Sequence, residues 1–203
     1  MTTATLAAPI TRVVRPREVD NHATYVSFGL AYVLGHGASA IAQGTDPLVE
    51  LPSWLPMTIL GTGLAVGSVC STVAAIRAQR GASRSDIFSG KLLGLSWAGA
   101  FIALFLAITG LSRALNLPEL PTMLWPTGSG FVVGLLYLGE GAVRRNVLHY
   151  CLGMWLALIS TAALFLGTAG LFWVLALAGG GGYAAATLLE RRRMATAADH
   201  AVR

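Results

Sequence analysis

Long apolar stretches that are nearly free of charge constrain the fold of this chain more than any other feature. An α-helix of about twenty apolar residues crosses the hydrocarbon core of a bilayer, roughly 30 Å thick, with its backbone hydrogen bonds satisfied internally. The sequence therefore predicts an all-α, polytopic integral membrane protein, a bundle of six transmembrane helices. The approximate spans are Thr24 to Gln43, Leu55 to Ile76, Leu92 to Leu111, Thr122 to Leu138, Val147 to Leu166 and Ala169 to Leu189.

Composition supports this class and excludes another. Charged residues make up 11% of the 203 residues, whereas soluble domains carry about 25%. A net charge of +5 also suits a nucleic-acid-binding protein, but the basic residues lie at the ends of the apolar stretches and not along one soluble face. We therefore expect the lipid bilayer, and no nucleic acid, as the surrounding partner.

The basic residues predict the orientation. Six spans place 13 of the 14 Lys and Arg residues on the side of the two tails, and Arg113 alone on the other side with Asp46, Glu50 and Glu119. Lys and Arg near span ends resist translocation, so both termini are predicted to be cytoplasmic, in the cell (plasma) membrane. The 13 residues are Arg12, Arg15, Arg17, Arg77, Arg80, Arg84, Lys91, Arg144, Arg145, Arg191, Arg192, Arg193 and Arg203.

The same spans divide the chain into three parts. Residues 1–22 are expected to be a disordered cytoplasmic tail, residues 23–190 the transmembrane domain and residues 191–203 a basic cytoplasmic tail. Ala38-Ser39-Ala40 loosely resembles a signal-peptide cleavage site, but the apolar stretch continues past it. The least marked division is Gly167-Thr168, since without a turn there the last two spans would form one helix of about 60 Å.

Small residues recur every four positions in five of the spans. Such a stripe lies on one helix face and lets two backbones approach closely. Packing within one bundle and a dimerisation face are both open interpretations, so a homo-oligomer is compatible with the sequence. The stripes are Ser27, Ala31, Gly35 and Ser39; Gly63, Gly67 and Ser71; Gly99, Ala103 and Ala107; Gly130 and Gly134; and Gly153, Ala157 and Thr161.

Two polar residues at membrane depth are candidates for a transport or ligand site. His36 stands between two glycines in the first span, and Ser129 follows Pro126 in the fourth. An ionisable residue inside a membrane is a functional candidate by default, whereas the alternatives are a histidine that hydrogen-bonds a neighbouring helix and a serine in the first turn of a helix. A His36–Ser129 pair would also suit an intramembrane enzyme.

Gly179, Gly180, Gly181 and Gly182 form the most unusual local feature, near the middle of the last span. Each glycine costs about 1 kcal/mol relative to alanine inside a helix. A helix broken there would expose backbone groups to a transport site, as in many transporters. The alternative is an intact helix that crosses a neighbour very closely.

Two further sites are predicted near the cytoplasmic surface. Glu140 and His149 flank Arg144 and Arg145, and they suit either a cytoplasmic proton gate or local pairing of Glu140 with an arginine. Arg77, Arg80 and Arg84 lie in the second connection, where they are candidates for contact with a cytoplasmic or membrane partner subunit.

No motif specifies a reaction, a metal or a cofactor. Cys70 and Cys151 are isolated within apolar spans, and no Cys/His cluster or phosphate-binding loop is present. We expect a small transporter, channel or permease subunit of unknown substrate. One alternative is a non-catalytic membrane component that assembles with a partner such as an ATPase. The second is an intramembrane enzyme that uses His36 and Ser129, although the sequence favours a protein that is not an enzyme.

Overall fold

A computed structural model describes residues 18–44, 47–80 and 82–202 of the chain. These residues are helical and contain no strand, which confirms the all-α prediction. Five segments have the length and hydropathy of membrane-spanning helices: His22–Ala42, Trp54–Gln79, Arg84–Leu115, Val147–Phe165 and Thr168–Thr196. Residues 1–17 of the predicted tail, which comprised residues 1–22, lie outside the described residues, as do Asp46 and Arg203.

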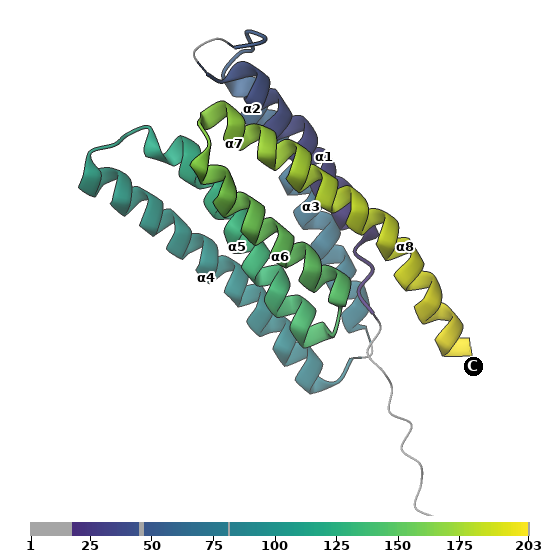
Figure 1. The fold of residues 1–203 in the computed structure, drawn as a ribbon. Helices are drawn as coiled ribbons and strands as arrows, with labels where there is room; N and C mark the ends of the chain where they lie inside the picture. The colour runs from purple at the N-terminus through teal and green to yellow at the C-terminus, as the bar shows by residue number, and fades with distance from the viewer. Residues whose placement is uncertain (1–17, 45–46, 81, 203) are drawn as a thin grey trace, which may run out of the picture.

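The helices run alternately up and down the molecule (Figure 1). The described N-terminal residues and the C-terminal part of α8 lie at one end, here called the terminal end, and the α2–α3, α4–α5 and α6–α7 connections lie at the other, here called the loop end. In chain order the elements are α1 (His22–Leu30), η1 (Ala31–His36), α2 (Gly37–Ala42), α3 (Trp54–Gln79), α4 (Arg84–Leu115), α5 (Leu120–Arg144), α6 (Val147–Ala162), η2 (Ala163–Phe165), α7 (Thr168–Val174), η3 (Leu175–Gly179) and α8 (Gly180–Val202).

Local signals in the sequence place several helix ends. Ser83 and Asp86 form a reciprocal capping box at the start of α4, and the Asn146 side chain accepts a hydrogen bond from the His149 backbone at the start of α6. The chain is extended at Leu166 and Gly167 before α7 begins at Thr168. The turn predicted at Gly167-Thr168 is therefore confirmed.

Two short π-helical segments, η1 and η3, pack against each other inside the bundle. Each interrupts a longer helix by widening it, and such segments often occur at functional sites. The last helix stays continuous through the four glycines, since Gly180 has α-helical angles of φ −59° and ψ −41°. The glycine run therefore does not break this helix, and the π-helical widening ends at its first glycine, Gly179.

Glycines set the closest helix crossings. A Cβ atom on Gly134 of α5 would lie 2.6 Å from the backbone nitrogen of Ala157 in α6, and one on Gly63 of α3 would lie 2.6 Å from the Cβ of Ala31. The small-residue stripes that include Gly134, Ala157, Gly63 and Ala31 therefore serve helix packing within the chain. Gly99 in the α4 stripe instead faces open space in the described structure.

Candidate functional site

A cavity of about 1090 Å³ lies between α3 on one side and α4 and α5 on the other. Its inner wall comes from η1, α2, α7 and α8, and its rim at the loop end includes Gln43, Ser53 and Thr122. The cavity exists because α3 packs on the first span while α4 packs on α5. α3 and α4 converge at the short connection that joins them, and they diverge towards the loop end (Figure 1).

His36 lies on the inner wall of this cavity, at the end of η1. Its side chain is buried, with only 3% of its surface exposed. The edge of its ring meets Tyr32 at a centroid distance of 4.9 Å, and Phe172 stacks on it at 6.0 Å. Its Nδ1 atom has no hydrogen-bond partner among the described residues. A buried polar atom without a partner is costly, so a hydrogen-bonding group that reached this nitrogen would stabilise the site.

Ser129 lines the same cavity from α5. The structure therefore brings the two polar candidates of the first and fourth spans to one space, as a shared transport or ligand site requires. No hydrogen bond joins Ser129 to His36 within the described part of the chain. The nucleophile–base contact of an enzymatic pair is absent from this conformation.

The cavity lining is apolar with scattered neutral polar groups. Within the described ranges, none of its lining residues is Asp, Glu, Lys or Arg. Pockets for small ligands commonly have volumes of about 300–1,000 Å³, with mostly apolar walls and few polar groups. The lining of this cavity therefore suits an uncharged molecule, and its volume lies just above that size range.

The four glycines lie behind the cavity, since none of them is among its lining residues. A Cβ atom on Gly179 would lie 2.5 Å from Cδ1 of Tyr32, one on Gly180 would lie 2.4 Å from Cγ2 of Val33, and one on Gly182 would lie 2.6 Å from Cδ1 of Trp155. Gly181 has no such neighbour within 4 Å in the described structure. Three glycines therefore allow close contacts, one of which positions the cavity-lining ring of Tyr32.

Glu140 and His149, the predicted gate, meet at the terminal end of the cavity. The distance between Glu140 Oε2 and His149 Nε2 is 3.4 Å, and His149 Nε2 has no hydrogen-bond partner among the described residues. Glu140 Oε1 instead accepts a hydrogen bond of 2.7 Å from Nε1 of Trp97, a cavity-lining residue. Tyr25 Oη and His149 Nδ1 are hydrogen-bonded at 2.7 Å.

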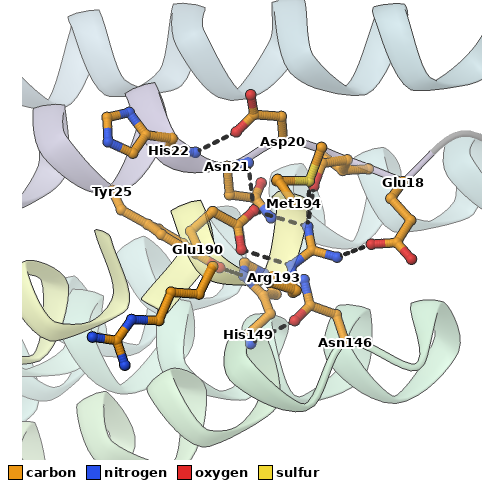
Figure 2. Close-up of polar contacts among 12 residues, drawn as sticks. Glu18, Asp20, Asn21, His22, Tyr25, Asn146, His149, Glu190, Arg193 and Met194 are labelled. Carbon is orange, nitrogen blue, oxygen red and sulfur yellow. Dashed lines mark hydrogen bonds and ion pairs between the residues drawn. The ribbon is translucent and has the colours of Figure 1, made fainter. Parts of the chain in front are cut away.

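A buried ion pair lies beyond this gate. The Glu190 carboxylate is fully buried and accepts hydrogen bonds from the Arg193 guanidinium and from the Asn21 backbone N–H, the latter at 2.8 Å. Figure 2 shows the Arg193 side chain reaching back to Glu18, and Arg193 also donates to the Val19 carbonyl. We call Glu18, Asn21, Glu190 and Arg193 the terminal cluster. It ties the N-terminal segment to α8.

The terminal cluster and the buried side chains of Tyr25 and Tyr32 were not predicted from the sequence. Glu190 carried a signal, because it ends an apolar span and stands three residues before an arginine, within reach on one helix face. Tyr25, Phe28, Tyr32 and His36 follow one another at helical spacing, which marks one face of the first span.

Buried rings link the cavity with the gate. The ring centroids of Tyr32 and Tyr183 are 5.2 Å apart, and those of Tyr137 and His149 are 4.0 Å apart. Tyr32 and Tyr183 line the cavity, and the Tyr137 hydroxyl is buried without a hydrogen-bond partner in the described residues. The terminal end of the cavity is thus closed by these aromatic rings and by Glu140 and His149, the predicted gate.

The remaining sequence candidates lie away from the cavity. Arg77 lies in the last turn of α3 and Arg84 begins α4. Both are exposed, as is Arg80 in the connection between these helices at the terminal end. Within the described residues, no group of three or more His, Cys, Asp and Glu side chains is arranged to hold a metal ion.

Comparison with known proteins adds no relationship. No protein-family model matches the chain. No curated protein and no solved structure matches it either.

Proposed function

We propose that this protein is a small transporter of an uncharged solute, with six membrane spans and both termini on the cytoplasmic side of the cell membrane. The observation that carries the proposal is the cavity between α3 and the α4–α5 pair, which has the unpartnered Nδ1 of His36 on its inner wall. A cavity of this kind in a membrane protein is the expected form of a solute site.

The two ends of the cavity have different roles in this proposal. The loop end is its mouth, since Gln43, Ser53 and Thr122 form the rim there. The terminal end is closed by Glu140, His149 and Tyr25, which join α5, α6 and α1. A solute that enters from the loop end reaches the cytoplasm only when these contacts separate. Alternating access then amounts to opening this gate while the mouth closes.

The two π-helical segments support a movement at this place. η1 and η3 contact each other beside the cavity, and η1 carries both Tyr32 and His36. A π-helical turn returns to an ordinary α-helical turn through a shift of one residue in the hydrogen-bond pattern. Such a shift in η1 would rotate His36 relative to α2 without unfolding the span.

Purified protein in liposomes tests this function. The measurement is efflux of three radiolabelled uncharged solutes: a polyol, a short amide and a short-chain acylglycerol. We expect protein-dependent flux of at least one solute. Ser129→Phe should lower that flux at least about tenfold, because an added ring fills the cavity.

Leu135→Phe is the matched control, because Leu135 is an exposed residue of the same helix and outside the cavity lining. It should leave the flux unchanged. Absence of flux for every solute in correctly inserted protein would refute the proposal. Equal flux in Ser129→Phe and the unaltered protein would show that the cavity is not the path.

A further inference from the structure

The cavity extends between α3 and α4. α3 packs on α1, η1 and α2, and α4 packs on α5, whereas α3 and α4 do not pack on each other to a comparable extent within the described residues; the two helices diverge towards the loop end (Figure 1). The cavity reaches between them, since Met57 and Leu60 of α3 and Phe101 of α4 line it. In a bilayer, a gap between two spanning helices faces lipid chains.

The α3 and α4 sides of the lining are mostly apolar, with Met57, Leu60 and Phe101 among their residues. The inner wall is mixed, since the polar residues Tyr32, His36 and Ser39 lie there with Phe28 and Phe172. A molecule that satisfies both regions has an apolar part towards the lipid and a hydrogen-bonding head towards His36.

The head must be uncharged. No Asp, Glu, Lys or Arg lines the cavity within the described residues, and a charge in a low-dielectric site without an opposite charge is strongly disfavoured. Neutral hydroxyl or amide groups instead match the available partners. His36 Nδ1 is such a partner, because it is buried and unpaired.

From the extension of the cavity between α3 and α4, its uncharged lining and the unpaired His36, we propose that the cavity binds a neutral, single-chain amphipathic lipid that enters from the membrane between α3 and α4. The volume of about 1090 Å³ lies just above the range of about 300–1,000 Å³ found for drug-sized ligands, which suits one chain with a small head. This inference deepens the proposed function, since it assigns a substrate class to the same cavity.

Photolabelling in lipid nanodiscs tests the inference. The probe is a monoacylglycerol with a photoreactive diazirine in its acyl chain, and mass spectrometry locates the labelled residues. We expect label on Met57, Leu60 or Phe101. Unlabelled monolauroylglycerol should compete in a saturable way, whereas free glycerol and the anionic lysophosphatidylglycerol should not. His36→Ala should weaken the competition several-fold.

Ser129→Phe and its control Leu135→Phe add a second readout. Cavity labelling should fall at least about tenfold in Ser129→Phe, because the added ring occupies the site, and stay unchanged in Leu135→Phe. Label spread evenly over lipid-facing residues, or labelling that excess monolauroylglycerol does not reduce, would overturn the inference. Competition in the unaltered protein decides the matter even if Ser129→Phe folds poorly.

The outcome is separable from that of the proposed function. Saturable cavity labelling without any flux in liposomes would support the lipid site and refute transport. Flux of the polyol or amide without competition by monolauroylglycerol would support transport and refute the lipid site.

Discussion

The ring of Tyr32 lies directly against Gly179, so that a Cβ atom at Gly179 would come within 2.5 Å of Tyr32 Cδ1. This contact connects the two unusual features of the chain, the π-helical segment of the first span and the glycine run of the last. Tyr32 in turn meets the His36 ring at a centroid distance of 4.9 Å. The glycine therefore supports the inner wall of the cavity from behind.

The glycine run offers a paired test of this contact. Gly179→Ala should lower the free energy of unfolding by about 1–3 kcal/mol, because the added methyl group forces Tyr32 to move. Gly181→Ala should raise it by up to about 1 kcal/mol, because alanine favours a helix and the space around Gly181 is open. Equilibrium unfolding in mixed detergent micelles measures both. Equal effects would show that the run acts through helix propensity alone.

The α5–α6 crossing supplies a second pair. Gly134→Ala should destabilise the protein by about 1–3 kcal/mol, since its Cβ would meet the α6 backbone, which does not yield as a side chain can. Gly139→Ala on the same helix should be neutral or stabilising, because no neighbour lies within 4 Å in the described structure. The same unfolding measurement compares them. A tolerated Gly134→Ala would mean that the two helices do not cross at this glycine.

The terminal cluster is expected to contribute strongly to stability. Glu190→Ala should lower the free energy of unfolding by about 3–5 kcal/mol, because it leaves Arg193 without its buried partner. Arg192→Ala, at an exposed neighbouring position, should change it by less than about 0.5 kcal/mol. Thermal unfolding in detergent ranks the two. An effect of Glu190→Ala as small as that of Arg192→Ala would place Glu190 in solvent.

The hydrogen bond between Tyr25 and His149 gives a test of the gate. Tyr25→Phe removes the hydroxyl and leaves Nδ1 of a buried histidine without a partner, so it should cost about 1–3 kcal/mol of stability. Tyr150→Phe is the control, since Tyr150 is exposed on the same turn of α6 as His149. Unfolding in detergent measures stability, and flux in liposomes reports the gate. A neutral Tyr25→Phe would argue against a closed gate at this contact.

The six-span topology is testable through α5, which is not among the five segments with span-like hydropathy. In a chain with Cys70 and Cys151 replaced by alanine, Glu119→Cys should react with a membrane-impermeant maleimide in intact cells. Arg145→Cys should react only after permeabilisation, because Arg and Lys near span ends resist translocation and so favour the cytoplasmic side for this connection. Reaction of both from the same side would mean that α5 does not cross the membrane.

Much of the fold could be predicted from one-dimensional patterns. The apolar stretches indicated helices of spanning length, and the turn at Gly167 followed from the limit that bilayer thickness sets on one helix. The site was predicted in part. His36 and Ser129 were identified as rare polar groups at membrane depth, but nothing in their spacing showed that they line one cavity. The sequence also left open whether the glycine run breaks the last helix. Helix propensity predicts a broken helix there, whereas close packing predicts an intact helix that crosses a neighbour closely.

The sequence by itself determined the class of protein, the helical segments and the polar groups buried within them, because hydropathy, charge and capping are properties of neighbouring residues. Only the tertiary structure decided which helices separate to form the cavity and which partners the buried charges find. Asn21 and Glu190 meet across 169 positions of the chain, and α3 and α4 diverge although a short loop joins them. Contacts of this kind depend on crossing angles, which arise from the packing of all the helices together.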